Sequence, residues 1–345
     1  MVEFEVNSPV IEAVGLKKEF SVSEQGKGFA GAVKALFSTK KRIVRAVDGV
    51  GFSIQPGEFV GYAGENGAGK STTIKILTGI LVPSAGTATV RGVVPYRDRK
   101  ANAANIGVVF GQRTQLWWDL PTSDSFEMLR AIYRIKRGDY ADMMKKLSDV
   151  LDLGPLMSVP VRKLSLGQRM KCDIAASLIH RPKVLFLDEP TIGLDVVAKE
   201  NIRQFLGEIN RTEGTTIILT THDMNDIERL CARLIILDKG RVIYDGLTEG
   251  LRQRFGHEKV LEVEFDGRSP AKTALPNLEI VAENGSKISF KYLEDGRSGG
   301  LAAIIGKLAA DFPVKDILVR EPSVEVIIRS IYEKTVSLPP YDGQK

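Results

Sequence analysis

The sequence is poor in cysteine, because its 345 residues include only Cys172 and Cys231. Two cysteines cannot form the disulfide framework of a small secreted protein, and their spacing matches no zinc-binding pattern. We therefore expect a chain that folds without covalent cross-links in a reducing compartment. At about 100–200 residues per domain, the length predicts two domains.

Long apolar runs and one-sided charge are missing as well. Runs such as Val184–Leu187 and Leu234–Leu237 are far shorter than the roughly 20 residues of a membrane-spanning helix. If the protein works at a membrane, another chain is expected to hold it there. The net charge is +5, from 48 basic and 43 acidic residues. These charges are scattered along the chain, so we expect no nucleic-acid partner.

Short apolar runs bounded by turn residues alternate with helical periodicity up to about residue 250. This alternation predicts an α/β fold with a parallel sheet whose strands are buried on both faces. Residues 118–182 contain no strand-like run and are predicted to be a helical insertion. Residues 234–246 predict a hairpin that turns at Asp238-Lys239-Gly240. The expected buried strands are Glu58–Gly64, Asn105–Gly111, Lys183–Pro190 and Thr215–His222.

The pattern changes after about residue 250. We expect a first domain over residues 8–250 and a small α+β domain over residues 258–335. The second domain has no phosphate-binding loop and is predicted to serve dimerisation or regulation. Its expected strands are Leu261–Phe265, Glu279–Val281, Lys287–Tyr292 and Lys315–Val319, and its expected helices are Leu301–Asp311 and Val324–Tyr332.

A phosphate-binding motif follows the first predicted strand. Residues 64–72 (GENGAGKST) match G-x-x-x-x-G-K-[ST]. Glycines let backbone N–H groups surround a phosphate, and the next helix points the positive end of its dipole at the same anion. Lys70 is expected to reach the β and γ phosphates, and the Ser71 hydroxyl to bind Mg²⁺. The predicted ATP-binding residues are Gly64, Asn66, Gly67, Ala68, Gly69, Lys70, Ser71 and Thr72.

A second site is predicted where another strand ends. Asp188 and Glu189 follow the apolar run Val184–Leu187, at the carboxyl end of a strand, where ligands bind in parallel sheets. Asp188 is expected to hold Mg²⁺, and Glu189 to act as general base on the attacking water. The alternative is a buried strand with a polar end.

Residues 164–168 (LSLGQ) lie between these two motifs. They resemble the signature motif of the ABC ATPase family, commonly LSGGQ, with Leu166 in place of the first glycine. They also fit a capping box at the start of a helix, and both interpretations can hold together. The resemblance covers about residues 10–250. It implies a P-loop NTPase (RecA-like) core of α/β class with antiparallel β and α-helical subdomains. The signature residues implied to face the ATP of a partner subunit are Ser165, Gly167 and Gln168.

The resemblance assigns four further residues. Gln112 resembles the Q-loop glutamine that contacts Mg²⁺, so the implied metal ligands are Ser71, Gln112 and Asp188. His222 resembles the H-loop histidine at the γ-phosphate, which makes Glu189, His222 and Gln112 the catalytic set. Asp195 resembles the D-loop residue at the dimer interface. Phe20 stands where an aromatic side chain stacks on adenine, with an ordinary core or surface residue as the alternative.

Residues 111–121 (GQRTQLWWDLP) resemble, more narrowly, a bacterial subgroup of sodium- and drug-exporting ATPases. In that subgroup the ATPase is a separate chain that pairs with a six-span permease. Trp117 and Trp118 fit a docking surface for a permease helix, or alternatively pack the helical insertion.

The function implied is an ATP-hydrolysing subunit that energises export through a polytopic membrane permease. Such a subunit lies peripherally at the cytoplasmic face of the plasma membrane. It works as a dimer with a second copy of itself or a paralogous ATPase. The alternatives are an importer ATPase and a soluble ABC ATPase of translation or chromosome maintenance.

An insertion between Phe20 and Ala46 is longer than most cassettes have there. Within residues 29–37 the apolar side chains fall on one stripe of a helix, and basic residues up to Arg42 lie around it. This pattern predicts a basic amphipathic helix that contacts the membrane or the permease. The alternative is a helix packed on its own domain, or a mobile loop.

Overall fold

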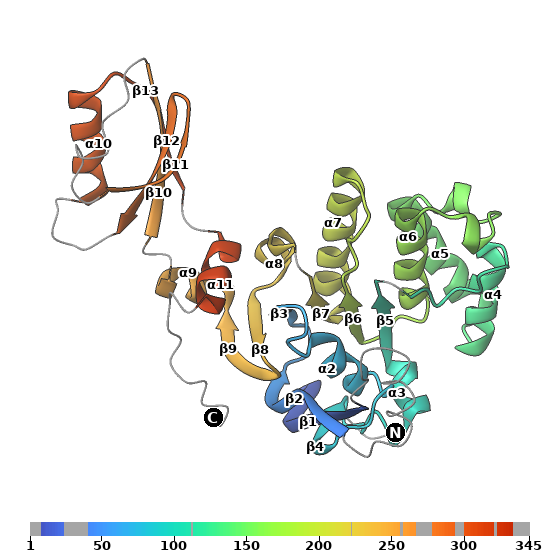
Figure 1. The fold of residues 1–345 in the computed structure, drawn as a ribbon. Coiled ribbons are helices and arrows are strands. Elements are labelled where there is room, and N and C mark those ends of the chain that lie inside the picture. The colour runs from blue at the N-terminus through green and yellow to red at the C-terminus, as the bar shows by residue number, and fades with distance from the viewer. Residues whose placement is uncertain are drawn as a thin grey trace, which may run out of the picture. The chain divides into compact units, whose positions relative to one another are not determined.

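A computed structural model describes residues 8–23, 41–111, 113–221, 223–255, 258–266, 278–293, 300–320 and 323–333. The chain divides into two compact units, with the boundary between Asp245 and Gly246 (Figure 1). The more detailed domain ranges expected from the sequence, 8–250 and 258–335, remain predictions, as do the roles assigned to them.

The first unit is built on a six-stranded sheet of order β5-β6-β7-β3-β8-β9. Its first five strands run parallel, and β9 returns from β8 through Lys239 and Gly240, both of which have positive φ. The predicted buried strands and the predicted hairpin over residues 234–246 are confirmed. The strands are buried because continuous apolar runs without alternation need cover on both faces of the sheet. The strands are β3 (Phe59–Gly64), β5 (Ile106–Phe110), β6 (Val184–Asp188), β7 (Thr216–Thr220), β8 (Arg233–Asp238) and β9 (Arg241–Leu247).

An antiparallel sheet of order β2-β1-β4 accompanies it. One hydrophobic core contains Ile11 and Ile54 of this sheet, Ile74 and Leu77 of α2, and Tyr62 of β3. Helix α2 therefore lies between the two sheets (Figure 1). The elements are β1 (Ile11–Ser23), β2 (Lys41–Ile54), β4 (Ala85–Val90) and α2 (Lys70–Leu77).

The antiparallel sheet shows that the predicted amphipathic helix does not extend to Arg42. Residues 29–37 lie outside the described part of the chain. The second strand already begins at Lys41, however, and Arg42 pairs with Val22 across the two strands. Arg42 therefore belongs to a strand rather than to a helix, because backbone pairing with β1 determines its conformation.

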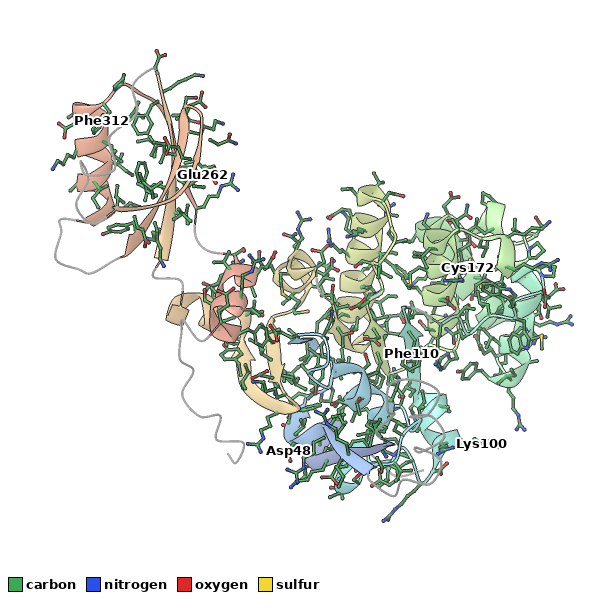
Figure 2. The ribbon with its side chains drawn as sticks, viewed as in Figure 1. Asp48, Lys100, Phe110, Cys172, Glu262 and Phe312 are labelled. Atoms are coloured by element: carbon green, nitrogen blue, oxygen red, sulfur yellow. The ribbon has the colours of Figure 1, made fainter. Side chains whose placement is uncertain are left out.

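The segment that the sequence predicts to be a helical insertion, residues 118–182, forms helices in the structure. It contains α4 (Thr122–Ile132), α5 (Arg137–Leu151) and α6 (Leu166–Leu178). Leu147 and Phe126 are fully buried among these helices, as is Cys172, which lies inside this segment (Figure 2). Burial raises the pKa of the Cys172 thiol to about 12, so this thiol stays protonated at neutral pH. The remaining helices of the unit are α3 (Arg99–Asn105), α7 (Val196–Glu213) and α8 (Met224–Leu230).

The second unit contains an antiparallel sheet of order β11-β12-β10-β13. Helix α10 covers one face, where Phe265 meets Phe312 edge-on at 6.1 Å, whereas Glu262 lies on the opposite face (Figure 2). The expected elements are confirmed; α9, which packs on α11, was missed. The elements are β10 (Glu258–Phe265), β11 (Leu278–Asn284), β12 (Lys287–Leu293), β13 (Val314–Arg320), α9 (Thr248–Phe255), α10 (Gly300–Asp311) and α11 (Val324–Tyr332). Across the described ranges, no helix has the length and apolarity needed to cross a bilayer.

Candidate functional site

The phosphate loop connects β3 to α2, and its geometry depends on Gly69. This residue has φ of 107°, and a Cβ at this position would collide with the carbonyl oxygen of Ala46, so only glycine fits. The loop is closed by a hydrogen bond from Ala68 N to Glu65 O at 3.0 Å, and Gly240 N donates to Ala68 O at 3.0 Å. The first N–H groups of α2 have no acceptor within the helix and are available to an anion.

Lys70 is the first residue of α2, and its side chain turns back over the loop. Its Nζ donates to the carbonyl oxygens of Gly64 at 2.5 Å and Glu65 at 3.1 Å. Burial lowers the pKa of Lys70, while the nearby carboxylates of Glu189 and Asp188 oppose this shift. The ammonium group is thus held where phosphate oxygens would enter the loop.

Ser71 and Asp188 bring the two motifs together across 117 positions of sequence. The Ser71 hydroxyl donates to Asp188 Oδ2 at 3.1 Å, and the Thr220 hydroxyl donates to the other carboxylate oxygen. Hydroxyl and carboxylate oxygens suit Mg²⁺, which usually takes one or two protein ligands besides phosphates and water. Within the part of the chain that the structure describes, no group of three or more His, Cys, Asp or Glu side chains is placed to hold a metal ion.

Glu189 has an unusual backbone. Its φ is 56°, a left-handed conformation that costs a non-glycine residue roughly 1–3 kcal/mol. Its N–H donates to the carbonyl oxygen of Thr220 at 2.9 Å. Strained conformations persist where the surrounding structure enforces them, and they concentrate at functional sites.

These side chains line one cavity of about 660 Å³, within the range of about 300–1,000 Å³ that small-molecule sites occupy. Three basic residues to which the sequence analysis assigned no role, Arg45, Lys75 and Arg113, also line it. Sequence reasoning missed Arg45 because strand pairing, not a local pattern, delivers it to the cavity. The predicted residues at the cavity are Asn66, Gly67, Gly69, Lys70, Ser71, Thr72, Asp188 and Glu189.

The signature residues lie elsewhere. Ser165 caps α6, with Gln168 N donating to its hydroxyl at 3.2 Å and its own N–H donating to Gln168 Oε1 at 3.0 Å. The predicted capping box is therefore confirmed. Asp195 caps α7 by accepting from Ala198 N at 2.8 Å. Ser165, Gln168 and Asp195 are exposed, and among the described residues the cavity does not include them.

Three further residues were predicted for the site: Gln112, His222 and Phe20. Gln112 and His222 lie outside the described residues. Phe20 is on β1 and 37% exposed; it does not line the cavity but pairs across the strands with Val44, which does. Lys18 Nζ stands 5.4 Å from the centre of the Phe20 ring.

The tryptophan pair has one exposed member. Trp118 is 49% exposed and carries the guanidinium of Arg169 at 5.5 Å from its ring, whereas Trp117 is half-buried. A docking surface for a permease helix at this place remains a prediction.

Comparison with known proteins places the site in a family. A family model described as "ABC transporter" matches residues 47–192. The ABC transporter ATP-binding protein NatA of Bacillus subtilis is 35% identical over 215 residues, which cover 62% of this chain and 87% of that protein. The Nod factor export ATP-binding protein I of Ralstonia nicotianae is 36% identical over 253 residues, covering 72% and 77%. The chain spans 17% of the human ATP-binding cassette sub-family A member 10, at 30% identity over 274 residues.

Solved structures agree. An ATP-binding subunit of an ABC transporter superimposes with a TM-score of 0.60 at 25% identity, covering 72% of this chain and 93% of that one. The ATP-binding cassette MJ0796, a dimer in a post-hydrolysis state with ADP and Pi, gives 0.58 at 25% identity, covering 69% and 98%. Together with the loop, the acidic pair and the capped signature helix, these matches show that the chain belongs to the ABC transporter family, as an ATP-binding and ATP-hydrolysing subunit.

Proposed function

We propose that ATP is bound with Mg²⁺ at the 660 Å³ cavity and that Glu189 activates the water that attacks the γ-phosphate. The observation that carries this proposal is the meeting of Lys70, Ser71, Asp188 and Glu189, from two distant motifs, at one cavity. Phosphoryl transfer depends mainly on positioning and electrostatics, which such a set of groups supplies.

Each residue has a distinct part in this proposal. The loop N–H groups and Lys70 bind the phosphates, and Glu189 accepts a proton from the attacking water. Ser71 and Asp188 would hold Mg²⁺, with Gln112 as a further ligand; the ion neutralises phosphate charge when bound. His222 contacts the γ-phosphate. Phe20 stacks on adenine, a place supported by its pairing with Val44 at the cavity.

Two copies of the chain, or this chain and a paralogous ATPase, complete the site in our proposal. Ser165, Gln168 and Asp195 are exposed and outside the cavity of their own chain, as expected if they meet nucleotide bound by a partner. The dimeric state of the similar cassette MJ0796 supports this arrangement.

The proposed transport direction is export, through a separate polytopic permease that holds this subunit at the cytoplasmic face of the plasma membrane. Support comes from relatives named for Nod factor export and for linearmycin resistance. Trp118, exposed beside Arg169, is the proposed permease contact. The α+β region over residues 258–335 is proposed to aid dimerisation or regulation.

The Glu189→Gln variant tests the proposed chemistry. Loss of a general base lowers turnover by roughly 10²–10⁴-fold, while ATP binding should survive because Lys70 and the loop are unchanged. ATPase rate and ATP affinity are measured side by side, with Glu208→Gln, an exposed residue of α7, as the matched control. A Glu189→Gln rate within a few-fold of the parent would remove Glu189 from this role.

A further inference from the structure

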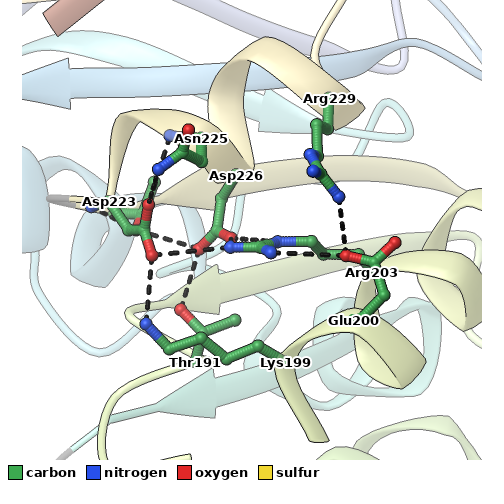
Figure 3. A network of polar contacts seen from close by, with 9 residues as sticks. Thr191, Lys199, Glu200, Arg203, Asp223, Asn225, Asp226 and Arg229 are labelled. Atoms are coloured by element: carbon green, nitrogen blue, oxygen red, sulfur yellow. Dashed lines mark hydrogen bonds and ion pairs between the residues drawn. The ribbon is translucent and has the colours of Figure 1, made fainter. Parts of the chain in front are cut away.

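A buried carboxylate on α8 joins the segments that follow β6 and β7 (Figure 3). Asp226 is fully buried. Its Oδ2 accepts hydrogen bonds from the hydroxyls of Thr191 at 2.8 Å and Thr221 at 3.3 Å. Its Oδ1 accepts from Nε of Arg203, on α7, at 2.6 Å. Three elements therefore converge on one side chain.

The two threonines lie beside residues assigned to hydrolysis. Thr191 is two positions after Glu189, in the turn that leaves β6, and Thr221 directly precedes His222 where β7 ends. A second link joins the same two segments, since Glu189 N donates to the carbonyl oxygen of Thr220 at 2.9 Å. Hydrogen bonds thus link the end of β6 to the end of β7 at Glu189 itself and, through Asp226, two residues after it.

The turn that begins at Glu189 needs contacts that hold its backbone in place. Glu189 holds φ of 56°, a conformation that relaxes unless neighbouring contacts enforce it. At Glu189 itself, the hydrogen bond to Thr220 and the bond from Ile192 N to Glu189 O at 3.4 Å restrain the backbone. Two residues further on, the Thr191 hydroxyl bonds Asp226, and Thr191 is only 5% exposed.

The remainder of the cluster keeps Asp226 in place. A buried carboxylate is tolerated when it is paired, and Arg203, itself 9% exposed, is the partner. Lys199 binds Asp223 at 3.0 Å, and Arg229 binds Glu200 at 2.7 Å. The cluster in Figure 3 thus contains three cations and three anions, so its charges balance.

We propose that Asp226 is a positioning residue for hydrolysis, which acts through Thr191 to hold Glu189 in its strained orientation and through Thr221 to fix the end of β7, directly before His222 in the sequence. This inference rests on the proposed role of Glu189. Because the cluster does not contact Lys70 or Ser71 among the described bonds, it predicts an effect on turnover without an effect on ATP affinity.

The Thr191→Val variant tests this, because valine keeps the shape of the side chain and removes only the hydroxyl. A small displacement of a reacting group can cost up to about 10²-fold in rate, so we expect kcat to fall by roughly tenfold or more with KM and ATP affinity unchanged. Thr191→Ser, which restores the hydroxyl, should recover turnover. Thr221→Val should lower kcat in the same way. Thr212→Val is the matched control, since its hydroxyl bonds Glu208 O in α7, away from the cluster.

The Glu189→Gln variant in the same assay separates the two proposals. If Glu189→Gln is inactive while Thr191→Val and Thr221→Val turn over like the parent, the positioning role is overturned and the general base stands. Failure of Thr191→Ser to recover turnover, or a rise in KM that accompanies the fall in kcat, would also overturn the positioning role. If Glu189→Gln is active, the general base falls, and the positioning of Glu189 falls with it.

Discussion

Asp173 shows at the scale of one residue how a buried carboxylate connects two parts of the nucleotide-binding unit. It lies in α6 and is 5% exposed. Its Oδ1 accepts from the Thr114 hydroxyl at 2.8 Å and Gln115 N at 3.1 Å, and Gln115 Nε2 donates to its carbonyl oxygen at 3.0 Å. The helix that begins at the signature is therefore tied to the segment just after Gln112.

Burial raises the pKa of Asp173 from 3.8 to about 6, although its hydrogen bonds oppose the shift. Between these values the folded protein binds more protons than the unfolded chain, so the free energy of unfolding falls as pH rises from about 4 to about 6. This shift corresponds to at most about 3 kcal/mol. Asp173→Asn keeps an oxygen for both donors and should remove this fall. Urea unfolding across that pH range measures it, and parallel profiles for parent and variant would contradict it.

Leu166 connects two elements, the start of α6 and the turn that precedes α7. Gly193 in that turn has φ of 72°, and a Cβ there would stand 2.5 Å from Leu166 Cδ2. The leucine that replaces a signature glycine therefore packs directly on Gly193. The turn that begins at Glu189 therefore contacts the signature motif where Gly193 meets Leu166.

Gly193→Ala should destabilise the protein by two effects. The left-handed conformation costs alanine about 1–2 kcal/mol, and overpacking against Leu166 adds about 1–3 kcal/mol. Gly214→Ala is the control for strain alone, since Gly214 has φ of 64° but no described atom lies within 4 Å of the place that a Cβ would take there. Combining Gly193→Ala with Leu166→Ala should remove only the packing part. Equal unfolding free energies for the Gly193 and Gly214 variants would refute the contact.

Elements whose cause is local could be predicted from the sequence. The buried strands β6 and β7 are continuous apolar runs, and the α6 start carries its own capping residues, Ser165 and Gln168. Helix α9 was missed because its eight residues, TEGLRQRF, contain few apolar side chains and pack against α11, which is distant in sequence. The strand at Lys41 was missed because its pairing partner is β1, not a neighbour in sequence.

The candidate site likewise contains residues that a local sequence pattern predicts and residues that only the fold brings to it. The phosphate loop and the acids Asp188 and Glu189 belong to contiguous motifs, which the sequence alone displays. Arg45 reaches the cavity through strand pairing, and Asp226 meets Thr191 across 35 positions. Such contacts exist only in the folded chain, so no local pattern marks them.

At the scale of the whole molecule, the separation of the signature from the cavity favours a composite site. In a two-fold dimer, each cavity would take its Lys70 from one subunit and its Ser165 from the other. Lys70→Ala and Ser165→Ala homodimers would each have two defective sites. A mixed dimer would carry both defects in one site and leave the other intact.

Mixing the two inactive proteins, under conditions that allow subunit exchange, should therefore restore ATPase activity. With equal amounts and random pairing, half of the dimers are mixed and each has one working site, so recovery should approach about a quarter of the parent rate. The matched control mixes Lys70→Ala with Asp188→Asn, which damage the same side of the site; every dimer then lacks an intact site, and no recovery is expected. Recovery confined to the first mixture would require residues from two chains at each site. If the first mixture stays inactive although mixed dimers are detected by mass spectrometry, each chain completes its own site.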